Sequence, residues 1–172
     1  MKRHIALTGF MAVGKSTIGK KLARRLNRRF YDLDEVIAKK HGPVSEIFEK
    51  IGEDAFRGFE FAELSKIIEG EEPAVVALGG GAVTYAPSLE LLKKSAYCVF
   101  IKLSPTQLLT RIRRSKNVRP LLGKAPTASA VEALYAKRLP LYMQSEVIIE
   151  AAHMTPPRVV DAIIQQLNED TP

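Results

Sequence analysis

Short apolar runs alternate along the chain with stretches whose apolar residues recur at helical spacing. Five runs predict strands, at residues 4–10, 30–34, 74–78, 97–103 and 146–150. The third and fourth runs are continuously apolar, which is typical of strands buried on both faces of a parallel sheet. Helical spacing is found at residues 16–27, 87–94, 105–113 and 157–167. The alternation predicts an α/β protein in which helices cover both faces of an open parallel sheet.

Two segments are less regular. Residues 34–69 fit helices that break near "HGP" and "IGED", with Ser45 as the N-cap of the stretch "EIFEKI". Residues 113–129 carry much charge, two prolines and little periodicity, so they predict a mobile loop. A chain of 172 residues is long enough for one well-buried core, and we expect a single domain over residues 1–172.

Composition narrows the class of partner. The net charge of +7 favours anions of some kind. The basic run "GKKLARRLNRR" fits a solvated helical face, and no aromatic residues interleave it as a nucleic-acid platform requires. The longest apolar stretch, "PAVVALGGGAV", is too short to span a bilayer. The single cysteine, Cys98, excludes an internal disulfide and fits a reducing cytoplasm, so we expect a cytoplasmic monomer that binds neither nucleic acid nor membrane.

The stretch "GFMAVGKST", residues 9–17, follows the first predicted strand and opens the first predicted helix. It fits the phosphate-loop pattern G-x-x-x-x-G-K-[ST]. Its glycines let backbone N–H groups converge on phosphate oxygens, and the helix start adds its positive dipole end. Lys15 would contact the outer phosphates and Ser16 would offer its hydroxyl to Mg²⁺. These residues predict a site for a nucleoside triphosphate.

The phosphate loop does not say where the phosphate goes, and water, a switch cycle or a small acceptor are all compatible with it. The chain has no N-K-x-D motif of the kind that reads guanine in GTPases. Motor and helicase ATPases usually place acids directly after an apolar strand, whereas the third strand here ends in three glycines. These two absences favour transfer to a small acceptor molecule, and residues that could bind such an acceptor are considered next.

Asp32 and Asp34 end the second predicted strand beside the phosphate loop. One carboxylate can serve the metal, and the other can orient and deprotonate an attacking hydroxyl. The alternative for Asp34 is that it caps the helix that follows.

Two arginines stand among apolar residues, Arg57 in "GEDAFRGFE" and Arg138 in "YAKRLPLY". Each can hold a carboxylate in a bidentate fork, or else serve as a surface or helix-packing arginine. The segment "LGGGAV", with Gly79–Gly81, lets a ligand approach the backbone N–H groups closely, unless it is only a tight exit from the strand. Arg119, before a proline, can swing over the reacting phosphates or remain an ordinary loop arginine.

Six motifs occur in one order over nearly the whole chain: "GFMAVGKST", "DLD", "GEDAFRGFE", "GGGAV", "NVRPLL" and "RLPLY". This ordered set resembles the shikimate kinase family. The resemblance implies a three-layer P-loop kinase fold like that of nucleoside monophosphate kinases, with a five-stranded parallel sheet in the order 2-3-1-4-5. It also implies transfer of the γ-phosphate of ATP to the 3-hydroxyl of shikimate, in the pathway to chorismate and the aromatic amino acids.

The resemblance also implies roles by position. Lys15, Asp34 and Arg119 would be catalytic, with Asp34 the base, and Ser16 and Asp32 would serve the metal, Asp32 through water. An acceptor-binding region at about 33–62 and a lid at about 112–126 would flank the site. The other implied positions are the shikimate-binding residues Arg57, Gly79, Gly80, Gly81 and Arg138, the nucleotide-binding residues Gly9, Ala12, Val13, Gly14 and Thr17, and the adenine neighbours Arg111, Thr155 and Pro156.

One position departs from the family pattern, which usually has glycine where this chain has Ala12. A positive φ there would strain the loop by about 1 kcal/mol. We expect a negative φ at Ala12, because the flanking Gly9, Gly14, Lys15 and Ser16 are intact.

Two rival functions stay open beside shikimate. A related kinase would act on gluconate or on a nucleoside monophosphate, although two arginines aimed at one carboxylate favour an acid. A member of a different class would be a regulatory ATP-binding module without catalysis, which has no physical need for Asp34, Arg57 and Arg138.

Overall fold

Five parallel strands form the centre of the fold. The computed structural model describes residues 2–115, 121–123 and 125–170. The strand order is β2-β3-β1-β4-β5, and every neighbouring pair is parallel, as expected. Leu7 lies opposite Ala77 and Thr8 opposite Phe100, so β3 ends beside the carboxyl end of β1, whereas β4 continues two residues further to Lys102. The strands are β1 (His4–Thr8), β2 (Arg29–Asp32), β3 (Ala74–Ala77), β4 (Ala96–Lys102) and β5 (Val147–Glu150).

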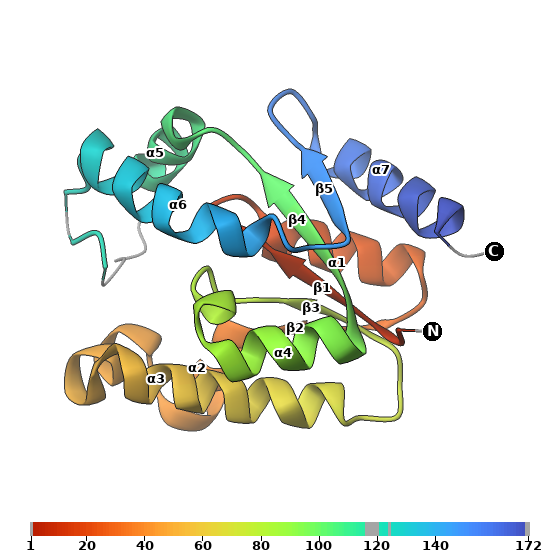
Figure 1. Ribbon diagram of the computed structural model, residues 1–172, viewed down its shortest axis with the longest axis horizontal. Coiled ribbons are helices and arrows are strands. Elements are labelled where there is room, and N and C mark those ends of the chain that lie inside the picture. Colours follow the sequence, from red (N-terminus) through yellow and green to blue (C-terminus); the bar gives the residue numbers. More distant parts are fainter. Residues whose placement is uncertain (1, 116–120, 124, 171–172) are drawn as a thin grey trace.

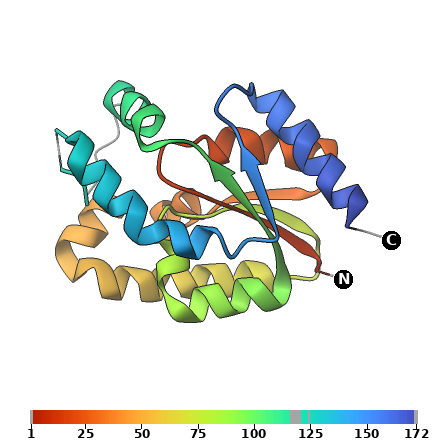
Figure 2. The same cartoon turned by 45° about the horizontal axis from the view of Figure 1, so that its top comes forward.

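Helices cover both faces of this sheet. Figures 1 and 2 show α1 beside α7 on one face and α3 beside α4 on the other. None of the helices in the described ranges is both long and apolar enough to cross a lipid bilayer. The helices are α1 (Lys15–Arg25), α2 (Leu33–His41), α3 (Val44–Ile68), α4 (Ala86–Ser95), α5 (Pro105–Arg114), α6 (Ala128–Tyr142) and α7 (Pro156–Glu169), with a short 3₁₀ turn η1 (Ala82–Thr84).

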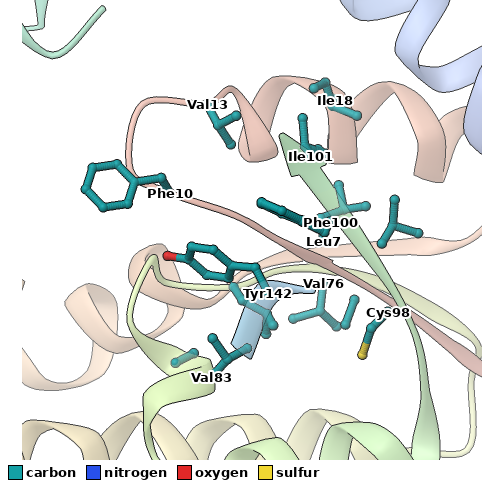
Figure 3. Close-up of a cluster of buried hydrophobic side chains, with 14 of the residues drawn as sticks. Leu7, Phe10, Val13, Ile18, Val76, Val83, Cys98, Phe100, Ile101 and Tyr142 are labelled. Atoms are coloured by element: carbon teal, nitrogen blue, oxygen red, sulfur yellow. The ribbon is translucent and has the colours of Figure 1, made fainter. Parts of the chain in front are cut away.

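The central strands are buried on both faces, as their apolar runs predict. Leu7, Val76 and Phe100 are completely buried. The ring of Tyr142, from the end of α6, stacks on Phe100 with centroids 5.0 Å apart and planes 27° apart. Figure 3 shows this aromatic pair within the cluster, with the Tyr142 hydroxyl turned to the side on which Phe10 lies. The core therefore reaches the carboxyl ends of the strands, where ligands bind in such folds.

The helical region between β2 and β3 breaks at the two predicted places. Gly42 ends α2 with φ 97°, and Gly52 interrupts α3 with φ 78°. The expected N-cap at Ser45 is wrong. The second helix begins at Val44 after Pro43, whose fixed φ is compatible with a helix start, and Ser45 lies in the first turn.

Helix α6 was not predicted, although its buried positions follow helical spacing. Val131, Tyr135, Arg138 and Tyr142 face inward. An arginine at a core-facing position and a proline in the last turn, Pro140, hide the apolar stripe from periodicity analysis.

The segment expected to form the lid, at about 112–126, overlaps the described helix α5. Residues 112–114 are its last turn, and α6 begins at Ala128, within the segment expected to be a loop. Arg119, the residue expected to reach the phosphates, lies outside the described residues.

The expectation of a negative φ at Ala12 is wrong. Ala12 has φ 62°, in the left-handed region that residues other than glycine and asparagine rarely adopt. The presence of the usual glycines at positions 9 and 14 does not remove the positive φ at Ala12. The loop has to turn back between Gly9 (φ 139°) and Gly14 (φ 106°), and the left-handed conformation at Ala12 is part of that reversal.

Replacing Ala12 by glycine therefore should stabilise the protein. We expect Ala12→Gly to raise the free energy of unfolding by about 0.5–1 kcal/mol, since the relief of left-handed strain exceeds the added freedom of the unfolded chain. Urea unfolding measures this change. The matched control is Ala133→Gly on the exposed face of α6, which should lower the free energy of unfolding by about 1 kcal/mol. Equal destabilisation by both variants would contradict a strained Ala12.

Candidate active site

Residues 9–14 form a tight loop between β1 and α1. Gly14 is the N-cap of α1 in a left-handed conformation, and the helix begins at Lys15. The buried ammonium of Lys15 donates to the carbonyl oxygens of Gly9 (2.8 Å) and Phe10 (2.9 Å). A helix N-terminus and a lysine ammonium thus meet in one concave loop, which is the arrangement that binds phosphate oxygens.

Two other positions expected to touch the nucleotide differ in what they can offer. The side chain of Val13 is in the hydrophobic core, 2% exposed, so only its backbone faces the loop. Its carbonyl accepts a hydrogen bond from Nη1 of Arg111 (2.9 Å). Thr17 is exposed on the first turn of α1. The sequence predicted that Val13 and Thr17 lie near the same ligand, but it did not predict which side chain is buried and which is exposed.

Helix α5 carries Arg111, one of the residues expected to border the adenine. Arg111 is tied to the phosphate loop, and Gln107 on the same helix donates to the carbonyl of Ala152 (3.2 Å). Helix α5 therefore holds the phosphate loop on one side and the segment before α7 on the other. Thr155 and Pro156 are exposed at the start of α7, and contact with adenine stays a prediction for them.

Ser16 and Asp32 face each other across α1 and β2. The hydroxyl of Ser16 donates to Oδ2 of Asp32, while Oδ1 accepts from the amide of Glu35 (3.4 Å) and caps α2. The alternative that Asp34 caps this helix is wrong, because Asp32 is the cap. Two hard oxygen donors fit Mg²⁺, which takes one or two protein ligands beside phosphates and water. No cluster of three or more metal-binding side chains occurs in the described ranges, so the phosphates and water would complete such a site.

Gly81 brings the two predicted arginines together. A Cβ at Gly81 would overlap Nη2 of Arg57 and would lie 3.0 Å from Nη2 of Arg138. Both guanidinium groups therefore reach one point on the glycine loop. Arg57 is 6% exposed and Arg138 2% exposed, so both charges are almost completely buried. The alternative of ordinary surface arginines is wrong for both.

Gly79 brings two carboxylates to the same loop. A Cβ at Gly79 would overlap Oε1 of Glu60 and would lie 3.0 Å from Oδ1 of Asp34. Asp34 is in the first turn of α2 and Glu60 in α3, so two helices converge here. Only a residue without a side chain fits between them.

Gly80 joins the acceptor side to the phosphate loop. A Cβ at Gly80 would lie 3.2 Å from the amide nitrogen of Met11. The Gly80 carbonyl accepts hydrogen bonds from Nη1 of Arg138 (3.1 Å) and from the hydroxyl of Tyr142. Burial raises the pKa of Tyr142 to about 12, so its hydroxyl stays protonated and donates. Sequence reasoning missed Tyr142, because its contact with Gly80 crosses 62 residues.

Glu60 is a further residue of this site that sequence reasoning missed. It is completely buried, and its Oε2 accepts from Nη1 of Arg57 (2.6 Å). Its Oε1 has no hydrogen-bond partner within the described part of the chain. Burial raises the pKa of Glu60, and the charge of Asp34 adds to this, whereas Arg57 and Arg138 oppose it. The available signal was the i, i+3 spacing from Arg57 in "RGFE".

These contacts form one site at the carboxyl ends of β1 and β3. A phosphate-binding loop lies directly against a glycine loop, on which two guanidinium groups and two carboxylates converge. Such a site can hold an anionic group between the arginines and a hydroxyl at Asp34, with a terminal phosphate nearby.

Sequence comparisons agree with this geometry. The family model described as shikimate kinase matches residues 11–168. A shikimate kinase of Thermodesulfovibrio yellowstonii is 36% identical over 165 residues, which cover 95% of this chain and 94% of the relative. A shikimate kinase of Geobacter sulfurreducens is 39% identical over 168 residues, covering 97% of this chain and 92% of the relative.

Solved structures agree as well. Shikimate kinase from Acinetobacter baumannii in complex with shikimate has a TM-score of 0.91 at 34% identity, covering 99% of this chain and 96% of that one. A gluconokinase from Sinorhizobium meliloti has a TM-score of 0.64 at 17% identity, covering 98% and 97%, and shares the fold alone. By its match to the family model and its identity with these relatives over nearly their whole length, the chain belongs to the shikimate kinase family.

Proposed function

We propose that this protein transfers the γ-phosphate of ATP to the 3-hydroxyl of shikimate, giving shikimate 3-phosphate and ADP. The observation that carries the proposal is the meeting of Asp34, Arg57 and Arg138 at one glycine loop that abuts the phosphate loop at Met11. The chain's membership of the shikimate kinase family supports the choice of acceptor.

The nucleotide side uses the phosphate loop. Backbone N–H groups of Gly9–Thr17 and the start of α1 hold the phosphates, and the Lys15 ammonium stabilises charge on the outer ones. Arg111 borders the adenine. Arg119, in the segment at about 112–126 expected to form a lid, would supply a further positive charge to the phosphates in the transition state.

The acceptor side uses the paired guanidinium groups. Arg57 and Arg138 hold the shikimate carboxylate, and each presents planar N–H donors suited to a carboxylate. Glu60 keeps Arg57 in place through the 2.6 Å ion pair and balances one of the two positive charges before the substrate arrives. The acceptor-binding region at about 33–62 supplies Asp34, Arg57 and Glu60.

The chemical step is a single displacement at phosphorus. The 3-hydroxyl oxygen forms a bond to the γ-phosphorus, while the bond to the bridging oxygen breaks and its electron pair leaves with ADP. Asp34 orients the hydroxyl and accepts its proton. Because the fold fixes both loops on one core, most of the rate comes from positioning and charge stabilisation.

Mg²⁺ is the metal that fits Ser16 and Asp32, and it neutralises charge on the β- and γ-phosphates when bound. The Ser16 hydroxyl would bind it directly and Asp32 through water. The proposal also includes a cytoplasmic monomer that forms one domain and acts on small molecules, without nucleic acid or membrane as partner. The lone cysteine supports the location.

An ADP-release assay with MgATP tests the acceptor. Shikimate, gluconate and the common nucleoside monophosphates are offered in parallel, and we expect turnover with shikimate far above the others. Turnover only with gluconate or a nucleotide would show that shikimate is not the acceptor. No ADP release with any of them would favour the regulatory module.

Arg138→Ala separates acceptor binding from nucleotide binding. We expect the KM for shikimate to rise at least about 30-fold, because one partner of a buried charged pair is lost, and the KM for ATP to stay within a few-fold. Steady-state kinetics in both substrates measures this. Lys137→Ala, the exposed neighbour on α6, should leave both constants unchanged. Equal rises in the two KM values would show that Arg138 does not bind the shikimate carboxylate specifically.

Asp34→Asn tests the proposed base. We expect kcat to fall about 100-fold or more, since the amide cannot accept the hydroxyl proton, with little change in ATP affinity. The control is Glu35→Gln, an exposed acid in the same first turn of α2 that pairs only at 3.4 Å with Lys20. An unchanged kcat for Asp34→Asn would exclude Asp34 from the chemistry.

A further inference from the structure

An open cavity lies at the β2 edge of the sheet. It has a volume of about 590 Å³ and is lined by β2, α2, α3 and the segment that follows α3. We call it the edge groove. None of the residues that form the candidate active site lines it. Its size is typical of small-molecule sites, which range from about 300 to 1,000 Å³.

The floor of the edge groove is apolar. Tyr31, Val36 and Ile67 contribute it, one from each of β2, α2 and α3, and all three are half-buried. β2 is an outer strand of the sheet, so no further strand covers it on that side. A flat apolar group placed here would contact a tyrosine ring and two branched aliphatic side chains.

One wall of the edge groove carries an excess of positive charge. Lys39, Lys40 and Lys66 line it together with one acid, Glu63, which is 3% exposed. Glu63 accepts from Lys66 (2.9 Å) and from Lys40, and His41 lies 3.4 Å from it. The lining here therefore carries three ammonium groups and one carboxylate, and two of the three, Lys40 and Lys66, pair with Glu63. Each ammonium has three donors, so Lys40 and Lys66 keep N–H groups for a ligand.

Lys39 is the lysine best placed to gain a partner. It is exposed and forms no ion pair with any residue in the described ranges. Glu63 stays ionised, because the hydrogen bonds from Lys40, Lys66 and His41 outweigh its burial and lower its pKa to about 2. The Glu63 carboxylate therefore forms ion pairs with Lys40 and Lys66, and the positive charge of Lys39 is not balanced by it.

The other charged residues of the lining, Arg29, Glu71 and Glu72, carry a net charge of −1. Arg29 forms an ion pair with Glu72, and Glu71 stands exposed beside them. A ligand is therefore oriented in the edge groove, with its anionic end at the lysine wall and its body over the floor.

We propose that the edge groove is a binding site for a small organic carboxylate with a flat apolar body. The carboxylate pairs with Lys39 and with the free donors of Lys40 and Lys66, while the body covers Tyr31, Val36 and Ile67. The same two helices carry Asp34 and Arg57, so a ligand in the edge groove bridges the elements that form the acceptor site. The inference does not depend on the proposed kinase activity.

Titration of the full chain with 2-naphthoate, followed by amide chemical shifts, tests the edge groove. We expect saturable shifts at Lys39, Ile67 and Gly70, and binding about tenfold weaker for the neutral analogue 2-naphthalenemethanol, which lacks the charged hydrogen bonds. Lys39→Glu should weaken 2-naphthoate binding about fivefold, the scale expected for an exposed pair. Lys93→Glu, at an exposed position in the last turn of α4, is the charge-matched control and should have no effect.

Three results would overturn the inference. One is the absence of saturable shifts at the edge groove up to about 10 mM ligand. Another is confinement of the shifts to Met11 and the glycine loop, which would place the carboxylate at the active-site arginines. The third is equal weakening by Lys39→Glu and Lys93→Glu, which would show a non-specific charge effect.

Discussion

The acceptor site depends on two guanidinium groups that are buried next to each other. Arg57 and Arg138 both reach the position that a side chain on Gly81 would occupy, and neither is more than 6% exposed. Like charges in such a place repel, and removal from water adds a cost of several kcal/mol per ion. Glu60 offsets part of this cost through its ion pair with Arg57. The remaining positive charge favours an anion at this place.

The spacing between the two halves of the site is set by the sheet. The phosphate loop leaves β1 and the glycine loop leaves β3, and these strands are paired in register. Tyr142 holds the carbonyl of Gly80 while its ring stacks on Phe100 of β4. The core therefore helps to hold both loops in place. A phosphoryl transfer, which relies on alignment more than on covalent chemistry, suits such a rigid platform.

Ala12 adds strain to an otherwise pre-formed loop. Its φ of 62° costs about 1 kcal/mol relative to glycine at the same place. The fold tolerates it because the loop is fixed at both ends, by the ammonium of Lys15 on the Gly9 carbonyl and by Arg111 on the Val13 carbonyl. Strain of this kind is common at functional loops, where the surrounding structure determines the conformation.

The sequence by itself determined the five strands, most of the helices and the phosphate loop, because these depend on short-range patterns. Apolar runs marked all five strands, glycines marked the breaks in the helical region, and one motif marked Lys15 and Ser16. The strand order came from the resemblance to a family, whereas Asp34, Arg57 and Arg138 were candidates from their chemical type and their neighbours in the sequence. Local patterns failed at two places. The buried Arg138 interrupts the apolar stripe of α6, so periodicity did not predict that helix. Ser45 was expected to cap a helix that in fact begins one residue earlier, after Pro43.

Only the tertiary structure decided how these residues meet. It paired Asp32 with Ser16, buried Arg57 against Glu60, placed Tyr142 on the Gly80 carbonyl and formed the edge groove. The physical reason is that burial and charge balance depend on every element packed around a side chain. A residue's spacing along the chain gives its face on a helix or strand, but its partners come from segments tens of residues away.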